Sequence, residues 1–528
     1  MNGPSYGDRD PVAAPATPLA ESALAIVRTS GGTSPQGEGG QSAIELLSRA
    51  FSRPRKLLSA PPDSLVHGWI IDPESAEKID EVMVSVYRAP RSYTGEDGAD
   101  ISCHGGIAVV RAVMAALKKA GFRGALPGEF TFRAFMNGKL DLTRAESVME
   151  LVASKTSKGR EQAVRRLAGV LQEEVSAIKA LLVQVLAGAE IYLDYSEDEF
   201  FGTGSSDEEA GRLPDRQLAE EAASRLRALA DLWRRERIYA EGALAVIAGR
   251  PNAGKSSLFN YLLREDRSIV TDIPGTTRDW IEALISVDGI PLRLADTAGL
   301  RNFNPKSSGS GGTDLKAADE AERIGIQRSL ELLDKADLIL YVIDGAEGIT
   351  GTDREFLLKR EEAAPAQPIL VLWNKADLAP PPNEGGLPLR NEFQQDTSQR
   401  NLFRRDISRR DTSQQNTSRQ ILAVSAKTGE GISGLLRSIA GLLEEPSSGK
   451  MSSAEQDAAG PGTVRQKELI DAALASVEEA LALAGGEEPL DIIAPLLRSS
   501  INSLGEITGE VSSADILETM FSRFCVGK

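Results

Sequence analysis

Residues 249–256 read Gly-Arg-Pro-Asn-Ala-Gly-Lys-Ser, and this stretch decides the fold of the chain around it. It fits the pattern G-x-x-x-x-G-K-[S/T], whose backbone N–H groups curl around a phosphate at the start of a helix. The apolar run 243–248 enters the loop and the run 256–263 leaves it, so the motif has the strand–loop–helix context that it requires. A chance glycine-rich turn, the alternative, would not need these flanks. The sequence therefore predicts an α/β domain in which Lys255 reaches the β- and γ-phosphates of a nucleotide and Ser256 binds Mg²⁺.

Two later motifs favour guanine over adenine. The apolar run 368–373 is followed by Asn-Lys-Ala-Asp at 374–377. The carboxylate of Asp377 can accept hydrogen bonds from both N1–H and the N2 amine of guanine, whereas adenine lacks this donor pair and would leave the carboxylate unpaired. A second apolar run, 421–424, leads into Ser-Ala-Lys at 425–427, whose backbone would meet the guanine O6.

The stretch between these motifs has the elements of a nucleotide switch. Asp296 ends an apolar run and would lie near the Mg²⁺ ion, and Gly299 would offer its N–H to the γ-phosphate. The loop 271–279 falls where a switch loop is expected, with Thr277 as the second Mg²⁺ ligand. In Ras-like enzymes a glutamine that orients the attacking water follows the Asp-Thr-Ala-Gly motif. Leu300 stands there and cannot hydrogen-bond, so another group must position water. In this order the four motifs resemble the G domain of translation-factor-like GTPases.

Composition narrows the class of protein. A chain of 528 residues suggests about three domains. The net charge of −17 disfavours a broad nucleic-acid-binding surface but permits a local basic patch or a basic partner. Only Cys103 and Cys525 occur, so we expect no disulfide framework. The best apolar run, 178–191, is interrupted by polar and charged residues, and the N-terminus lacks signal character. We therefore expect a cytoplasmic protein that does not enter a membrane.

The sequence pattern indicates a multidomain protein with α+β and α/β parts. Short β-like runs and one helical run make 11–140 a small α+β domain. Apolar residues at three- and four-residue spacing between Leu167 and Ile191 predict long amphipathic helices in 141–240. Alternating strands and helices give 241–445 the pattern of a P-loop G domain with a mixed, mainly parallel sheet. The segment 446–528 is helical again, so we expect one helical domain with the G domain inserted; the sequence does not prove that its two blocks pack together.

Three segments are expected to lack regular structure. They are rich in glycine and serine or in polar near-repeats, and they cover 202–214, 307–312 and 380–420. We interpret the last as a low-complexity insertion that acts as a solvated tether; contact of its arginines with RNA is the alternative.

Further motifs make the resemblance specific. Within the G domain they are the stretches 249–258, 272–279, 296–301 and 322–326, and outside it 25–31, 93–97, 103–106, 127–130, 137–142 and 524–528. Together they resemble the MnmE (TrmE) family of tRNA modification GTPases over nearly the whole chain. The sequence departs from the family at 19–21, in the insertion after Arg301 and in the insertion 380–420.

The resemblance implies a role for many residues. Asn252 would coordinate K⁺ together with Thr271, Ile273 and Thr276, in the place of an arginine finger, and dimerising G domains would complete that site. Glu322 would act as the catalytic residue that orients water through a second water molecule; a glutamate at the start of a helix is the alternative. Mg²⁺ would be held by Ser256 and Thr277. The residues implied to contact GTP are Asn252, Ala253, Gly254, Lys255, Ser256, Ser257, Thr271, Asp272, Ile273, Pro274, Gly275, Thr276, Thr277, Asp296, Thr297, Ala298, Gly299, Asn374, Lys375, Asp377, Ser425, Ala426 and Lys427.

The N-terminal domain resembles the folate-binding and dimerisation domain of the family. The implied ligand is 5-formyl- or methylene-tetrahydrofolate, and the matching residues are Arg28, Glu96, Lys139 and the terminal Lys528. A surface ion pair is the alternative for each residue taken alone. Cys525 would be a small apolar residue beside that ligand or, alternatively, a nucleophile.

The family implies a homodimeric, K⁺-dependent GTPase that works with the FAD-dependent MnmG (GidA) in a heterotetramer or larger complex. That complex would add a carboxymethylaminomethyl-type group to C5 of the wobble uridine of tRNA. A ribosome-assembly GTPase of the Era or Der kind is the runner-up, because it shares the P-loop and the Gly-Thr-Thr-Arg-Asp loop. A nucleotide-dependent scaffold without turnover is a third possibility, which Leu300 would permit.

Overall fold

The computed structural model describes residues 6, 10–32, 41–194, 213–264, 282–296, 330–364, 367–381, 421–444, 459–486, 488–511 and 514–528. The chain forms two compact units. Unit 1 comprises Met1–Val152, Ala163–Ala230 and Ala458–Lys528, and unit 2 comprises Ala153–Gln162 and Asp231–Asp457. The segments 202–214, 307–312 and 380–420, which we expected to be irregular, lie wholly or largely outside the described residues.

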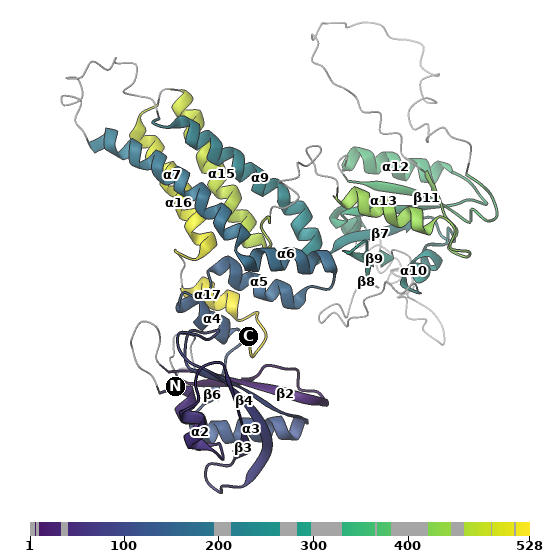
Figure 1. Cartoon of the computed structure of the whole chain (residues 1–528). Helices are drawn as coiled ribbons and strands as arrows, with labels where there is room; N and C mark the ends of the chain where they lie inside the picture. Colours follow the sequence, from purple (N-terminus) through teal and green to yellow (C-terminus); the bar gives the residue numbers. More distant parts are fainter. Residues whose placement is uncertain are drawn as a thin grey trace, which may run out of the picture. The chain divides into compact units, whose positions relative to one another are not determined.

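The N-terminal part of unit 1 is built on a six-stranded sheet with the order β3-β4-β5-β2-β1-β6 (Figure 1). Its pairs are antiparallel except for β1 with β6. Side chains from one face of the sheet and from α1 and α3 form one hydrophobic core. This arrangement confirms the α+β architecture expected for this part of the chain. The elements are β1 Val12–Pro15, β2 Ser22–Ser30, α1 Ala43–Arg49, α2 Pro54–Leu58, β3 Ser64–Ile71, β4 Lys78–Tyr87, β5 Gly98–Gly105, α3 Ile107–Ala120, β6 Arg123–Gly124 and α4 Glu129–Met136.

The helical part of unit 1 joins the two helical blocks of the sequence. Buried residues between Leu171 and Leu229 share one core with buried residues between Ile470 and Ile507. Figure 1 shows α7, α15 and α16 running beside one another. The predicted apolar stripe was wrong at Ile191, which is 52% exposed, while Ala189 is buried. The helices are α5 Leu142–Ala153, α6 Ser157–Ala168, α7 Val170–Asp194, α9 Arg216–Glu241, α15 Val464–Gly485, α16 Leu490–Thr508 and α17 Ala514–Phe521; α6 and α9 each have residues in both units.

A buried carboxylate also ties the two helical blocks together. Glu146 on α5 accepts hydrogen bonds from Arg465 at 2.8 and 2.9 Å and from Gln466 at 2.5 Å. Arg465 in turn donates to the carbonyl oxygens of Glu506 and Ile507 near the end of α16. Because a buried charge is costly without partners, this set of contacts fixes how the blocks meet.

One helix among the described residues is long and apolar enough, by length and composition, to cross a membrane: Val170–Leu193 within α7. Its residues Leu171, Val175, Ile178 and Leu182 are fully buried in the core shared with the other helices of unit 1. One face of this helix therefore lies in the core of unit 1.

Unit 2 is an α/β domain around a second six-stranded sheet, with the order β12-β11-β10-β7-β9-β8. Only β8 and β9 pair antiparallel, so the sheet is mixed and mainly parallel, as predicted. Residues of α10 and α13 pack on one face and residues of α12 on the other. Burial on both faces explains the continuous apolar runs that the sequence shows before each motif. The elements are β7 Ala243–Gly249, α10 Lys255–Arg264, β8 Glu282–Val287, β9 Ile290–Asp296, β10 Leu338–Asp344, α12 Gly351–Ala363, β11 Ile369–Asn374, β12 Ile421–Ala423 and α13 Ile432–Glu444.

The helical core yields a stability prediction. Ile178→Ala removes a fully buried side chain from α7 and should lower the free energy of unfolding by about 2–5 kcal/mol. Val183→Ala, on the same helix but 45% exposed, should change it by less than about 0.5 kcal/mol. Urea titrations followed by far-ultraviolet circular dichroism measure both. Equal effects of the two changes would contradict the packing assigned to α7.

Candidate functional site

The loop between β7 and α10 adopts a conformation that only small or special residues tolerate. Gly249 has φ 141°, Gly254 has φ 93°, and Asn252, which carries a side chain, has φ 63°. A Cβ atom at Gly249 would lie 2.3 Å from the carbonyl oxygen of Val342, and one at Gly254 would lie 2.2 Å from Nδ2 of Asn374. The backbone therefore needs glycine at both ends of the loop, for conformation and for space.

Oxygen ligands suited to Mg²⁺ meet at the start of α10. The hydroxyl of Ser256 donates a hydrogen bond of 2.9 Å to Oδ2 of Asp296 at the end of β9. Hydroxyl and carboxylate oxygens are what this hard cation prefers. Nearby, Nζ of Lys255 donates to the carbonyl oxygen of Arg250 at 2.7 Å, which folds the ammonium group back over its own loop. The residues present thus fit a phosphate group with its magnesium ion.

The loops after β11 and β12 meet the same edge of the sheet. Nδ2 of Asn374 donates to the carbonyl oxygen of Ala253 at 2.8 Å, and Oδ1 of Asn374 accepts from the N–H of Ala426 at 3.1 Å. The hydroxyl of Ser425 donates to Oδ1 of Asp377 at 2.7 Å. These contacts join three motifs that are far apart in the sequence. Within them, Asn374 and Ser425 are buried. Asp377, which we expected to bind guanine, lies beside them.

Sequence reasoning missed Asp344, the last residue of β10. Its Oδ2 accepts a hydrogen bond of 2.6 Å from Nζ of Lys375, and the carboxylate is 7% exposed. Burial opposes ionisation of this carboxylate, but Lys375 and the N–H of Ala346 outweigh it and hold the pKa of Asp344 below its usual value. A carboxylate at the carboxyl end of a buried strand, before Gly345, was the signal that could have revealed it.

Several expected site residues lie outside the described residues. They are Thr271, Asp272, Ile273, Pro274, Gly275, Thr276, Thr277, Thr297, Ala298, Gly299 and Glu322, and Leu300 lies outside with them.

Unit 1 holds a cavity of about 210 Å³ on the face of its N-terminal sheet that carries Arg28. The residues that line it are Arg28, Thr29, Tyr87, Ser92, Tyr93, Thr94, Gly98, Asp100 and Phe130. The guanidinium of Arg28 pairs with Asp100 at 2.9 Å and donates to the carbonyl oxygen of Gly527 at 3.4 Å. Burial works against its charge, but the partnership with Asp100 raises the pKa of Arg28. The cavity thus combines a fixed cation with aromatic side chains, and the C-terminal segment contacts the same cation.

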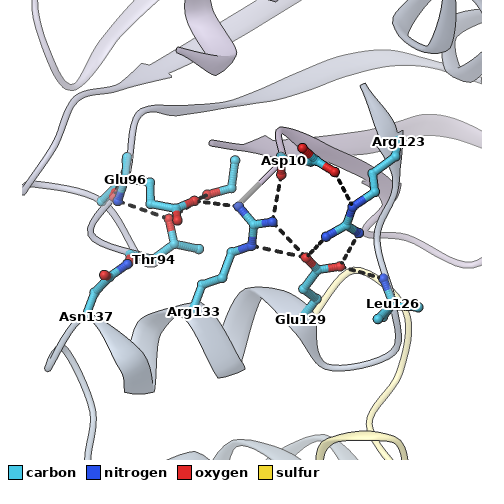
Figure 2. A network of polar contacts seen from close by, with 10 residues as sticks. Asp10, Thr94, Glu96, Arg123, Leu126, Glu129, Arg133 and Asn137 are labelled. Atoms are coloured by element: carbon cyan, nitrogen blue, oxygen red, sulfur yellow. Dashed lines mark hydrogen bonds and ion pairs between the residues drawn. The ribbon is translucent and has the colours of Figure 1, made fainter. Parts of the chain in front are cut away.

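A buried charge network lies behind the loop that lines this cavity (Figure 2). Glu129, fully buried at the start of α4, accepts two hydrogen bonds each from Arg123 and Arg133 and one from the N–H of Leu126. Burial would raise the pKa of Glu129, but Arg123, Arg133 and this N–H together lower it. Arg133 also donates to Oε2 of Glu96 at 2.9 Å. The network therefore connects α4 with the loop 92–96.

The four residues expected to bind folate are thus not equivalent. Arg28 lines the cavity, whereas Glu96 is 7% exposed and its Oε2 is held by Arg133 and Ser30. Nζ of Lys139 donates to the carbonyl oxygen of Pro90 at 3.0 Å, just before the loop 92–96. Lys528 belongs to the tail whose Gly527 meets Arg28.

The tail itself packs against α4. The N–H of Gly128 donates to the carbonyl oxygen of Cys525 at 3.3 Å, and a Cβ atom on Gly128 would lie 2.8 Å from Cβ of Phe524. Cys525 is exposed. The C-terminal segment is therefore held against the start of α4, and Lys528 is not among the residues that line the cavity.

Comparison with known proteins gives matches to the whole chain. A family model described as the GTP-binding protein TrmE N-terminus matches residues 11–139, and one described as the MnmE helical domain matches 142–525. The tRNA modification GTPase MnmE of Treponema denticola is 41% identical over 99% of both chains, and that of Carboxydothermus hydrogenoformans is 36% identical over 98% of this chain and 99% of its own. A solved structure of Aquifex aeolicus Era bound to GDP·AlF4⁻ is 22% identical, covers 44% of this chain and 66% of its own, and has a TM-score of 0.25, too low to support an argument.

The pair of Asp344 and Lys375 makes stability depend on pH. Lys375→Ala should lower the free energy of unfolding at pH 7 by about 1 kcal/mol, a modest value because Lys375 is 34% exposed and water screens the pair. The folded pKa of Asp344 lies below its unfolded value, so its contribution is complete above about pH 4 and is lost as the pH falls further. Urea unfolding from pH 7 to 3.5 measures the difference between parent and variant.

Lys359→Ala is the matched control. Lys359 pairs with Glu355 on the exposed side of α12, and its removal should leave stability unchanged across the same pH range. A difference for Lys375→Ala that stays constant down to pH 3.5 would contradict the role assigned to the ion pair.

Proposed function

The chain belongs to the MnmE family, and from this premise we propose that it is a GTPase that acts in the modification of tRNA. The observation that carries the proposal is the meeting of three motifs at one sheet edge, where Asn374 joins the P-loop at Ala253 to the loop after β12 at Ala426. GTP turnover by the purified protein tests the first half. Mass analysis of wobble uridines in tRNA from cells that lack the gene tests the second.

The nucleotide contacts follow from the chemistry of the described groups. We assign Lys255 to the β- and γ-phosphates, which would draw its ammonium away from the carbonyl oxygen of Arg250. Ser256, with Asp296 behind it and Thr277 from the switch loop, would hold Mg²⁺, which neutralises charge on the phosphate oxygens. Asp377 would accept from the guanine N1–H and N2 amine, and Ser425 would fix its orientation. For the other residues that the resemblance implies in GTP binding, we propose the same contacts as those given under Sequence analysis.

For hydrolysis we propose K⁺ in place of an arginine finger. Asn252, which has φ 63° and is exposed, would offer its side-chain oxygen, and Thr271, Ile273 and Thr276 would complete the set of oxygen ligands. Glu322 would orient the attacking water, because Leu300 cannot. Dimerisation of G domains would close this site.

For unit 1 we propose that the cavity binds a reduced folate that donates one carbon. Arg28 offers a cation to the anionic glutamate tail, and Tyr93, which is 40% exposed, offers aromatic surface to the pterin ring. Glu96 would accept from the N–H edge of the pterin. Lys139 and Lys528 would add positive charge at the rim.

The larger assembly is proposed on the family alone. We infer a cytoplasmic homodimer that works with the FAD-dependent MnmG and adds a carboxymethylaminomethyl-type group to C5 of the wobble uridine. We also propose domain limits of 11–140, 141–240, 241–445 and 446–528, with the second and fourth segments as one helical domain. Relatives that carry the MnmE name match 98–99% of the chain, so the Era or Der interpretation is not retained.

Asp377→Asn should change base specificity. Asparagine cannot accept from both guanine donors, so affinity for GTP should fall by about 1–3 kcal/mol, or roughly 5- to 150-fold. Its amide can donate to the C2 carbonyl of xanthine, so affinity for xanthosine triphosphate should rise. Calorimetric titration with the two nucleotides measures both effects. Asp334→Asn, the same change at a carboxylate that is 67% exposed, is the control, and parent-like GTP binding by Asp377→Asn would overturn the assignment.

GTP turnover should require K⁺. A cation of the right radius would complete the site that Asn252 begins, and smaller Na⁺ would not match the same oxygen ligands. Turnover is measured in KCl and NaCl at equal ionic strength, with nucleotide affinity as the control because binding of GDP should not differ. Equal rates in both salts would refute the proposal.

Arg28→Gln should weaken binding of 5-formyltetrahydrofolate by about tenfold or more, since it removes the cation from the cavity. Arg53→Gln, an exposed position of the same sheet domain, should leave affinity unchanged. GTP turnover checks that unit 2 is intact. Folate binding that survives both Arg28→Gln and deletion of 526–528 would exclude this cavity as the folate site.

A further inference from the structure

The second residue of the P-loop motif, Arg250, has contacts that nucleotide binding does not explain. Its side chain is 19% exposed and points away from the loop. Nε pairs with Asp353 at 3.0 Å, one terminal nitrogen pairs with Glu347 at 2.7 Å, and the other donates to the carbonyl oxygen of Gly348 at 3.0 Å. The guanidinium therefore ties the P-loop to the segment that runs from β10 into α12.

Asp353, the anchor of these contacts, is fully buried. Its carboxylate also accepts from the hydroxyl of Tyr341 at 2.8 Å and from both the N–H and the hydroxyl of Thr350 at 2.8 Å. Burial first, and then the bond to Asp353, raises the pKa of Tyr341. Arg250 is the cation among these partners, and the other donors hold the carboxylate in one orientation. The carboxylate of Asp353 is thus held by several donors, and Arg250 connects it to the P-loop.

The P-loop needs such an anchor because its backbone is unfavourable by itself. Asn252 lies in the left-handed region at φ 63°, which costs a residue with a side chain about 1 kcal/mol or more. The contact from Asn374 to Ala253 holds the C-terminal half of the loop. Arg250 holds the N-terminal half.

The same segment also touches the guanine-specificity motif. The N–H of Gly345 donates to the carbonyl oxygen of Asn374 at 2.8 Å, and Asp344 pairs with Lys375. Residues 344–350 are therefore in contact with the phosphate-binding loop on one side and with the base-binding loop on the other.

We propose that Arg250 is a positioning residue of the nucleotide site, which holds the P-loop in its binding conformation by fastening it to Asp353 and to the loop 344–350. Its guanidinium is occupied by Glu347, Gly348 and Asp353, so it acts on affinity by removing the need to order the loop when a phosphate binds. The inference rests on the proposed function, because it presumes that the loop binds a nucleotide.

The test is titration of the nucleotide-free full-length protein with GDP, together with GTP turnover. Arg250→Gln should weaken GDP affinity about tenfold and raise KM by a similar factor, while kcat at saturating GTP stays within about threefold of the parent. Arg250→Lys keeps the charge but cannot span three acceptors, so it should restore only part of the affinity. A merely structural role would not separate KM from kcat in this way.

Arg360→Gln is the matched control for general damage. Arg360 lies on the same helix as Asp353, is 8% exposed, and pairs with Asp334 at 2.6 Å and with Gln367 at 2.9 Å. The change should lower the melting temperature as Arg250→Gln does, yet leave GDP affinity unchanged. Parent-like GDP binding by Arg250→Gln, or an equal loss of affinity in Arg360→Gln, would overturn the inference. Failure of the parent to bind GDP would instead overturn the proposed function on which it rests.

Discussion

Parallel pairing of β7, β10, β11 and β12 is the constraint on which the nucleotide site depends. Parallel strands place their carboxyl ends at one edge, and helices on both faces bury the strands, so none can slip without exposing apolar side chains. Motifs more than a hundred residues apart, such as Ala253 and Asn374, are thereby brought within hydrogen-bond distance. The sheet thus brings the motifs together, and hydrogen bonds between the loops fix their arrangement.

In unit 1, contacts between buried charged side chains hold several elements together. Arg133 and Glu129 are almost or fully buried, and a charge in such a place is tolerated only when its hydrogen bonds are complete. Completing them draws together β6, α4 and the loop that carries Glu96 (Figure 2). The aromatic side chains of Phe132 on α4 and Phe521 on α17 are also in contact, with centroids 5.4 Å apart. This helix therefore contacts both the loop that carries Glu96 and the C-terminal tail.

The sequence predicted the two sheets, the helical blocks and the P-loop because each has a local signature of period, glycine or apolar run. It also predicted that Lys255, Ser256 and Asn374 would share a site. It did not predict Arg250, Asp344 or Asp353, whose importance comes from partners that are distant in the chain. It named Glu96 and Lys139 through a resemblance, but it could not show that Glu96 binds Arg133 or that Lys139 binds the carbonyl oxygen of Pro90, because packing decides these partners.

What the sequence determined by itself was the type of each element and the chemistry available at each strand end. Spacing of apolar residues and the positive φ angles of Gly249 and Gly254 are local, so the sequence alone indicates them, whereas the close approach of Val342 and Asn374 to these glycines is tertiary. Which side chain pairs with which was decided only by the tertiary structure. The pairing of Arg250 with Asp353, of Lys375 with Asp344 and of Arg465 with Glu146 depends on how far elements approach one another. That approach is set by the burial of the whole core, which no single stretch of sequence encodes.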